Sequence, residues 1–207
     1  MSADQGTPEW LLERCGKVTA SRMDDLLATT KSGPAASRAN YMAELVCQRM
    51  TGTVEKGFSN AYMQWGTDQE PFARAAYEIL TGQVVEEVGF IAHPTIAMAG
   101  ASPDGLVGLD GMLEIKCPNT AGHIDFLLDG KIPGKYQLQM AWQMACCGRK
   151  WVDYASFDPR LPEKLQLKVV RFMRDDAKIA DMEASVIKFQ QEIDTKVSAL
   201  TKLMEEV

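Results

Sequence analysis

The chain has 207 residues, of which 46% are hydrophobic and 24% are charged. These values are ordinary for a soluble globular protein and argue against two separate domains, leaving one domain or one domain with a helical appendage. The formal net charge of -6 argues mildly against a protein that coats nucleic acid, although it leaves room for a local basic groove.

Cellular location and redox state follow from two further features of the composition. The sequence has neither a secretory signal nor an uncharged apolar run long enough to span a membrane, so we expect a cytoplasmic protein. The five cysteines are odd in number and form no C-x-x-C pair. This pattern argues against a zinc ribbon or a disulfide framework and predicts free thiols.

The N-terminal part of the chain predicts a short helix followed by an exposed loop. Thr19 or Ser21 is placed to cap a helix that carries Met23, Leu26 and Leu27 on one side. The stretch TTKSGPAASR, residues 29–38, is rich in Ser, Thr, Gly and Pro and is typical of a loop.

Two longer helices are predicted next. The first runs from about Arg38 to Met50, with Gly52 as its stop signal. The second runs from about Asn60 to Leu80, with Gly82 as its C-terminal signal and Pro71 placed to kink it. The apolar face predicted for this second helix holds Tyr62, Trp65, Phe72, Ala76 and Leu80.

The middle of the chain predicts a sheet. From Gln83 to Pro118 the segments are short, β-branched and punctuated by glycine, which predicts consecutive antiparallel strands. A helix is predicted over about Tyr136 to Cys147, followed by strands in WVDYASFD (151–158) and LQLKVVRFM (165–173). This order predicts an α+β fold, layered α/β/α, with a mixed central sheet flanked by helices on both faces.

The C-terminal part predicts one long amphipathic helix. From residue 175 onward apolar residues recur at spacings of three and four, which predicts a helix over about 175–206, roughly 45 Å long. Its apolar positions are Ile179, Met182, Val186, Phe189, Ile193, Val197, Leu200 and Met204. The helix is a candidate for docking or oligomer formation, and packing against its own domain is the alternative.

The segment SPDGLVGLDGMLEIKCP, residues 102–118, reads as a tight hairpin that carries two carboxylates and a lysine. Glu114 and Lys116 are two residues apart, so on a strand they project from one face while the intervening apolar residues face the other way. A two-residue turn at Asp110 and Gly111 would put Asp104 on the opposite face. A three-residue loop over 109–111 would bring Asp104 beside Lys116, so a shared site requires that loop or an equivalent bulge.

The chemistry of these three side chains suggests a metal site. Two carboxylates held this close repel each other unless a divalent cation lies between them, and hard oxygen ligands suit Mg²⁺ or Mn²⁺. An ammonium group beside them could orient a water molecule or stabilise charge on a phosphorane-like transition state. The alternative is that Asp104 is only the turn residue of a P-D-G sequence, and that Glu114 and Lys116 form a solvated ion pair.

A Pro-Asp pair, a gap of nine residues and then Glu-x-Lys resembles the PD-(D/E)xK nuclease core. The wider sequence resembles the lambda exonuclease family, also called YqaJ-like viral recombinase nucleases, from about Trp10 to Arg160. The segments that carry this resemblance are WLLERCGKVTAS, WGTDQEPFA, ASPDGL, LEIKCP, YQLQMAWQM and FDPR. It implies a single nuclease domain over 1–207, with a recognisable core over 10–160 and the C-terminal helix outside it.

The resemblance implies which residues would be catalytic. Asp104 and Glu114 would be metal ligands, together with the backbone carbonyl of Ile115, and Lys116 would be the catalytic lysine. Glu70, in W-G-x-x-x-E-P, would complete the acidic site through water; the alternative is an exposed helix charge.

The resemblance also implies a glutamine near the metal. Gln139 would hydrogen-bond water or phosphate there, with Gln137 and Gln143 as competing candidates. The implied cofactor is Mg²⁺, for which Mn²⁺ would substitute, with two ions per site.

Other residues match positions that contact DNA in the family. Arg14, Ser21 and Ser102 would receive the 5′-terminal phosphate, because a guanidinium binds phosphate oxygens bidentately and hydroxyls donate alongside it. Met63 lies where relatives carry an apolar wedge, and Lys31 lies where relatives place a basic residue that tracks the duplex. The alternatives are a surface arginine, cap or turn serines, a core methionine and a solvated lysine.

The activity implied is that of a metal-dependent 5′→3′ exonuclease. It would digest one strand of linear double-stranded DNA to 5′-mononucleotides and leave a 3′ overhang for recombination by strand annealing. The implied partners are DNA ends, a single-strand annealing protein and further copies of the chain in a ring-shaped homotrimer, with no membrane involved.

Two other functions stay open at this point. An endonuclease with the same core, of resolvase or restriction type, would fit the metal residues but leave the match at Arg14, Ser21 and Ser102 unexplained. A DNA-end-binding recombination module could retain the same residues without turnover.

Overall fold

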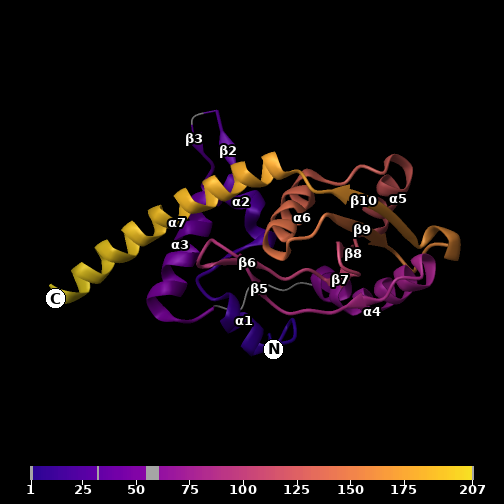
Figure 1. The fold of residues 1–207 in the computed structure, drawn as a ribbon, viewed down its shortest axis with the longest axis horizontal. Helices are drawn as coiled ribbons and strands as arrows, with labels where there is room; N and C mark the ends of the chain where they lie inside the picture. The colour runs from indigo at the N-terminus through magenta and orange to yellow at the C-terminus, as the bar shows by residue number, and fades with distance from the viewer. Residues whose placement is uncertain (1, 32, 55–60, 207) are drawn as a thin grey trace.

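The computed structural model describes residues 2–31, 33–54 and 61–206 (Figure 1). The helices of this part of the chain are α1 (Pro8–Arg14), α2 (Met23–Leu27), α3 (Ala36–Thr51), α4 (Ala61–Thr81), α5 (Thr120–Asp129), α6 (Gly134–Cys147) and α7 (Asp176–Glu205), with 3₁₀ turns η1 (Ala20–Arg22) and η2 (Glu163–Leu165). The strands are β1 (Val18–Thr19), β2 (Thr29–Thr30), β3 (Gly33–Pro34), β4 (Val85–Glu86), β5 (Ile91–Ala92), β6 (Ala99–Ala101), β7 (Gly105–Val107), β8 (Gly111–Lys116), β9 (Trp151–Phe157) and β10 (Leu167–Met173).

The central sheet is mixed, as the sequence predicts. Its strand order is β10-β9-β8-β7-β4, with β8 parallel to β9 and the other neighbours antiparallel. Helix α4 packs against β8, β9 and β10, while α5 and α6 contact β9, and the apolar side chains form two separate clusters. Helices therefore flank both faces of the sheet, which confirms the layered α+β prediction.

Strand β8 divides its side chains between these two clusters. Leu113 and Ile115 are buried in the same cluster as Ala73 and Tyr77 of α4, whereas Met112 belongs to the cluster that contains α6. Because side chains alternate along a strand, Glu114 lies on the α6 side with Met112. The predicted alternation of residues 113–116 is confirmed.

The buried face of α4 differs from the prediction. Ala73 and Tyr77 are buried, whereas Tyr62, Phe72 and Leu80 are exposed. The residues that pack with the sheet are Ala73, Ala76 and Tyr77, so the prediction is confirmed for Ala76, and the hydroxyl of Tyr77 donates to Asp153 at 2.8 Å. A small residue at 73 and a hydrogen-bonded tyrosine decide this face, so counting large apolar residues chose the wrong one.

The predicted cap of α2 is also wrong. The helix begins at Met23 after Arg22, and neither Thr19 nor Ser21 makes a side-chain capping bond. Thr19 belongs instead to β1, where its N–H donates to the Tyr41 hydroxyl at 3.1 Å. The predicted burial of Met23 and Leu26 is confirmed.

The strands between 83 and 118 do not form one consecutive meander. β4 pairs with β7 in the central sheet, whereas β5 pairs with β6 in a smaller sheet that β1 joins in parallel. Within the loop predicted over 29–38, β2 and β3 form a short antiparallel pair. Strands of two or three residues are too short for a sequence period to assign them to a sheet.

Helix α5 was missed because its start looks like a turn. Asn119 is its N-cap and accepts the Gly122 N–H at 2.8 Å, and Gly130 ends it with a positive φ of 65°. Asparagine and glycine between apolar runs indicate turns and helix caps equally well.

Helix α7 packs on the domain through its first two thirds only. Its side chains from Ile179 to Ile193 at the predicted spacing are buried, and Arg38 and Arg49 of α3 form ion pairs with Glu192 and Asp194. Toward the C-terminus the helix runs away from the rest of the molecule (Figure 1), and Leu203 and Met204 are exposed. The predicted range and the predicted apolar face are confirmed up to residue 193.

Across the residues that the structure describes, no helix is long and apolar enough to cross a membrane. All five cysteines are free, as predicted.

We expect Phe189→Ala to lower the free energy of unfolding by about 3–5 kcal/mol, because Phe189 is fully buried and stacks on Tyr41 with ring centroids 5.7 Å apart. Leu203→Ala, on the exposed end of the same helix, should change it by less than about 0.5 kcal/mol. Urea unfolding followed by circular dichroism measures both values, and equal losses would contradict this account of α7 packing.

Candidate active site

The hairpin β7–β8 brings Asp104 and Glu114 together. Its register pairs Gly105 with Leu113 and Val107 with Gly111, so the loop consists of residues 108–110. The loop has the three residues that a shared site requires, but it lies one position earlier than predicted, and Gly108 provides the left-handed φ of 54°. Continuing this register places Asp104 opposite Glu114 rather than beside Lys116.

Asp104 lies just before β7 and is fixed by the backbone of β8. Its Oδ2 accepts the Ile115 N–H at 2.6 Å. Ile115 thus binds Asp104 through its N–H, and the carbonyl of the same residue is predicted to be a metal ligand. This bond therefore places one carboxylate oxygen beside the backbone at Ile115, and within the described part of the chain no hydrogen bond is made to Oδ1.

Glu114 is fully buried, and hydrogen bonds replace the water that its carboxylate has lost. Its Oε1 accepts from Lys116 Nζ and from Gln139 Nε2 at 2.6 Å, and its Oε2 accepts from Gln143 Nε2 at 2.6 Å. Gln139 and Gln143 are four residues apart on α6, so one face of that helix supplies both amides. These donors make a buried carboxylate tolerable on this strand.

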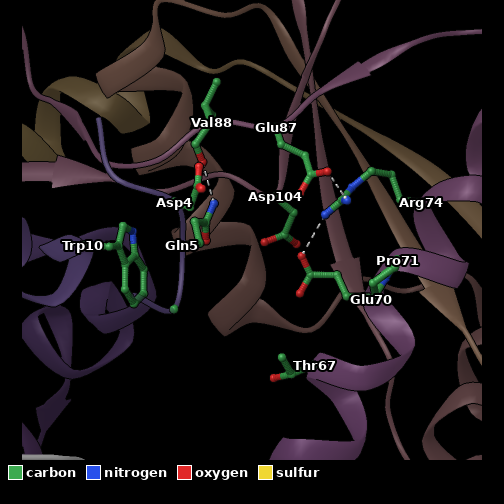
Figure 2. Close-up of a pocket in the computed structure, with 11 residues that line it drawn as sticks. Asp4, Gln5, Trp10, Thr67, Glu70, Pro71, Arg74, Glu87, Val88 and Asp104 are labelled. Carbon is green, nitrogen blue, oxygen red and sulfur yellow. Dashed lines mark hydrogen bonds and ion pairs between the residues drawn. The ribbon is translucent and has the colours of Figure 1, made fainter. Parts of the chain in front are cut away.

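Glu70 reaches the same site from α4. Its carboxylate accepts from Arg74 at 3.3 Å, and Arg74 also pairs with Glu87 at 2.6 Å. Figure 2 shows Glu70 and Asp104 extending toward each other from α4 and from the β6–β7 connection. Glu70 is half-buried and lines a cavity together with Asp104. The alternative of an exposed helix charge is therefore wrong.

The charges of this cluster act strongly on one another. Burial raises the pKa of Asp104 well above its ordinary value, and Glu114 and Glu70 raise it further, while Lys116 opposes them. Burial also raises the pKa of Glu70, against the attraction of Arg74 and Lys116. Burial alone would lower the pKa of Lys116, but Glu114 and Asp104 outweigh it and raise the pKa, so Lys116 stays an ammonium ion.

This donor set fits a small hard cation. The carboxylates of Asp104, Glu114 and Glu70 outnumber the one ammonium group of Lys116 that acts on them. Mg²⁺ is held in proteins by one or two carboxylates, with the remaining positions left to water or substrate. Among the residues that the structure describes, no group of three or more His, Cys, Asp or Glu side chains could hold a metal alone. A metal here would need oxygens from the backbone, from water or from a substrate, as the expected ligand role of the Ile115 carbonyl implies.

Arg14 and Ser21, two of the three predicted phosphate-binding residues, line a neighbouring cavity, and hydrogen bonds from Arg14 and Trp10 join Ser102 to it. Arg14 donates to the Ser102 hydroxyl at 3.1 Å, Trp10 Nε1 donates to the same hydroxyl at 2.9 Å, and the Arg14 guanidinium lies 4.2 Å from the centre of the Trp10 ring. Burial lowers the pKa of Arg14, although a guanidinium stays charged near neutral pH. Across the described residues no carboxylate forms an ion pair with Arg14, so its charge is available to an anion.

Ser21 connects this cavity to the catalytic lysine. It lines the cavity of Arg14 and also the cavity that contains Lys116, Gln139 and Glu70. The structure therefore brings Arg14 into contact with Ser102 and places Ser21 in a cavity with Arg14 and in another with Glu70 and Lys116. No capping role remains for Ser21.

Met63 and Lys31, the two residues predicted to contact the duplex, lie in different parts of the structure. Met63 is 56% exposed and lines the Lys116 cavity beside Tyr62, so core packing does not account for it. Lys31 is exposed in the turn between β2 and β3, a hairpin that projects from the body of the molecule (Figure 1). Lys31 lies outside the cavities described above.

Sequence reasoning left some residues of the site unassigned. Gln139 and Gln143 both bind Glu114, whereas Gln137 donates to the Ile132 carbonyl at 2.8 Å and is not part of the site. Arg74, four residues after Glu70, was missed. The spacing of four between Gln139 and Gln143, and between Glu70 and Arg74, was the available signal.

Comparison with known proteins gives both family and structural matches. Residues 9–150 match the profile of the YqaJ-like viral recombinase domain. An alkaline exonuclease (LHK-Exo) from Laribacter hongkongensis is 53% identical and superposes with a TM-score of 0.90, covering 97% of this chain and 99% of that one. A second structure, of LHK-Exo in complex with dAMP, gives 54% identity, the same TM-score of 0.90 and the same coverage.

A more distant structure shares the fold. A phage-related exonuclease from Haemophilus somnus 129PT is 16% identical with a TM-score of 0.72, covering 89% of this chain and 96% of that chain. No curated protein sequence matches the chain.

We expect Asp104→Asn to stabilise the metal-free protein at pH 8. A pKa raised above the ordinary 3.8 means that the folded protein binds this proton more tightly than the unfolded chain, so the ionised carboxylate opposes folding increasingly as the pH rises from about 4 to the raised value. The variant should gain roughly 1–3 kcal/mol at pH 8, and the gain should vanish near pH 4.

Thermal unfolding in a chelator across this pH range measures the difference. Asp110→Asn, at the exposed tip of the same hairpin, is the matched control and should show no such trend. Added Mg²⁺ should stabilise the wild type more than Asp104→Asn, and a variant that is less stable than the wild type at pH 8 without metal would contradict the assignment.

Proposed function

The chain belongs to the YqaJ-like viral recombinase family, and on that premise we propose that it is a metal-dependent 5′→3′ exonuclease acting on linear double-stranded DNA. The observation that carries the proposal is the adjacency of two sites. A carboxylate and lysine cluster at the end of β8 shares Ser21 with a cavity containing an unpaired arginine. The near-complete overlap with a relative described as an alkaline exonuclease supports the same activity.

The proposed chemistry assigns a task to each residue of the cluster. Asp104, Glu114 and the Ile115 carbonyl would hold Mg²⁺, or Mn²⁺ in its place and two ions per site, with Glu70 acting through water. When bound, the ions supply Lewis-acid stabilisation of the charge on the scissile phosphate. Lys116, an ammonium ion fixed on Glu114, orients the attacking water and neutralises developing charge on a phosphate oxygen.

Gln139 and Gln143 keep this arrangement in place. Gln143 holds Oε2 of Glu114 from inside the protein, where it is fully buried, while Gln139 lies on the cavity side and shares Oε1 with Lys116. Gln139 is therefore also within reach of a water molecule or phosphate in the cavity. The carboxylate keeps one orientation whether or not substrate is present.

The proposed polarity follows from the cavity that contains Arg14. If Arg14, Ser21 and Ser102 hold the 5′-terminal phosphate, the next phosphate along the strand falls near Lys116, and hydrolysis there releases one 5′-mononucleotide. The relative solved with dAMP, a nucleoside 5′-monophosphate, supports a product of this class. Repeated removal leaves a 3′ overhang, which suits recombination by strand annealing.

The DNA duplex itself would meet the rim of the catalytic cavity. Met63, partly exposed there, is proposed as the apolar wedge that separates the terminal base pair. Lys31, on the projecting β2–β3 hairpin, would track the duplex backbone farther from the site.

A ring-shaped homotrimer, acting with a single-strand annealing protein, completes the proposal. Lysines and arginines need only line a central channel, so the net charge of -6 can reside on the outside. The end of α7, with Leu203 and Met204 exposed, is a candidate surface for contact with another copy of the chain or with the annealing protein. This assembly would operate in the cytoplasm of a bacterial or phage-infected cell.

The activity is tested on a linear duplex with 5′-phosphates, labelled at each end of each strand, beside a covalently closed circle. We expect Mg²⁺-dependent release of mononucleotides from 5′ ends, no cutting of the circle, and a loss of roughly 10²–10³-fold or more in Lys116→Ala. Lys150→Ala, which removes an exposed lysine paired with Asp110, is the control and should retain activity.

Other outcomes of this assay discriminate between functions. Cutting of the closed circle would favour an endonuclease of the same core. Binding of DNA ends without any cleavage would favour a non-catalytic recombination module, and loss of label first from 3′ ends would contradict the proposed polarity.

We expect Arg14→Gln to abolish the preference for a 5′-phosphate. Cleavage of 5′-phosphorylated ends should slow by roughly 10–100-fold, because a charge-assisted hydrogen bond to phosphate is lost, while 5′-hydroxyl ends should be cleaved at nearly the wild-type rate. Arg22→Gln is the matched control, because Arg22 lines the same cavity but already pairs with Asp25 and Glu44. Equal slowing on both kinds of end would contradict the assignment of Arg14.

A further inference from the structure

A further cavity adjoins the one that contains Lys116 and shares no lining residue with the cavity of Arg14. It has a volume of about 460 Å³ and lies between the end of β8, α5 and the start of α6. Lys116, Cys117, Lys135 and Tyr136 line both this cavity and the catalytic one. The two cavities therefore meet at the catalytic lysine and at the first turn of α6.

Two lysines converge on one aromatic ring at this junction. The Lys116 ammonium lies 5.1 Å from the centre of the Tyr136 ring, and the Lys135 ammonium lies 4.8 Å from the same centre. A cation near an aromatic face is attracted to it, so Tyr136 favours both positions. Since both distances are measured to the same ring, the two ammonium groups lie no more than about 10 Å apart.

Among the described residues, the interaction of Lys135 with Tyr136 is not accompanied by an ion pair. Within residues 2–31, 33–54 and 61–206, no carboxylate forms an ion pair with Lys135 or with Lys131, the other lysine of this cavity. Asp129 also lines the cavity, but its carboxylate accepts the backbone N–H of Lys131 at 2.8 Å. An unpaired surface lysine is common; the distinguishing feature of Lys135 is its position against Tyr136 beside Lys116.

The shared lining residues put these groups in a fixed order. Arg14 connects through Ser21 to the cavity of Lys116, and that cavity connects through Lys135 and Tyr136 to the cavity of Lys131. Arg14, Lys116, Lys135 and Lys131 thus line three cavities that are joined by shared residues, alongside carboxylates that include Asp24, Asp25, Asp125 and Asp129. A DNA strand carries one phosphate per nucleotide and would need such a succession of cations.

We propose that Lys135 binds the backbone phosphate immediately 3′ of the scissile one on the strand being digested. The inference rests on the proposed function, because the 5′ end bound at Arg14 sets the direction in which the strand continues. Lys135 contacts a phosphate, which is the same at every nucleotide, so the contact positions the strand without reading its sequence. It would keep the strand in register with Lys116 after each nucleotide is removed.

The test uses a 5′-phosphorylated duplex in which one linkage of the digested strand is a neutral methylphosphonate. The substitution is placed at the first, second or third linkage from the 5′ end, and binding is measured by fluorescence anisotropy in a chelator, so that no cleavage occurs. For wild-type protein, neutralising the second linkage should weaken binding by roughly 3-fold, which is typical of one partly exposed charge pair.

Lys135→Gln should weaken binding of unmodified DNA to a similar extent. In this variant a methylphosphonate at the second linkage should no longer weaken binding, while the effects at the first and third linkages should stay as in the wild type. Its binding should also depend less on salt, with the slope of log K against log salt smaller by about one. Lys131→Gln is the matched control, because Lys131 lines the same cavity but not the catalytic one. It should keep the penalty at the second linkage.

A Lys135→Gln protein that retains this penalty, or a Lys131→Gln protein that loses it equally, would overturn the proposal. The same DNA incubated with Mg²⁺ separates this inference from the proposed function. If the protein digests 5′ ends but Lys135→Gln keeps the penalty at the second linkage, the phosphate contact is wrong and the proposed function stands. If Lys135→Gln loses the penalty but the protein digests no DNA, the contact stands and the proposed exonuclease activity is wrong.

Discussion

The buried carboxylate of Glu114 is the constraint on which the rest of the structure depends. A charge in the middle of a central strand is costly unless donors replace its lost water. Lys116, Gln139 and Gln143 supply those donors, which fixes how α6 must face β8. Lys116, the proposed catalytic lysine, is thereby positioned by the same bonds that make the buried carboxylate tolerable, so removing the charge would affect both stability and the proposed chemistry.

The acidic excess at the site has a complementary role. Burial raises the pKa of Asp104, and the nearby carboxylates of Glu114 and Glu70 raise it further. Stability is sacrificed at this point in the metal-free protein, and a divalent cation would recover it. Binding sites commonly carry such local strain, because the ligand supplies the missing favourable interaction.

Connected cavities give the site its direction. Ser21 lies between the arginine cavity and the catalytic cavity, and Tyr136 with Lys135 lies between the catalytic cavity and the next one. In the proposed function, the arginine and lysines of these cavities let a chain of net charge -6 contact one DNA strand locally. The apolar cluster of α3, α6 and α7 packs against Tyr136, so it supports one of the residues that line two of these cavities.

The sequence by itself determined the layered α+β fold, the long C-terminal helix, the alternation of residues 113–116 and the identity of Asp104, Glu114 and Lys116 as one group, because these follow from local periodicity and from a motif within a single hairpin. It could not decide which face of α4 is buried, which sheet the two-residue strands join, or which glutamine of α6 reaches Glu114. Only the tertiary structure decided these points, since each depends on contacts between segments far apart in the chain. The arginine cavity shows the same division: Arg14 and Ser102 are 88 residues apart, so their hydrogen bond exists only once the small sheet of β1, β5 and β6 has formed.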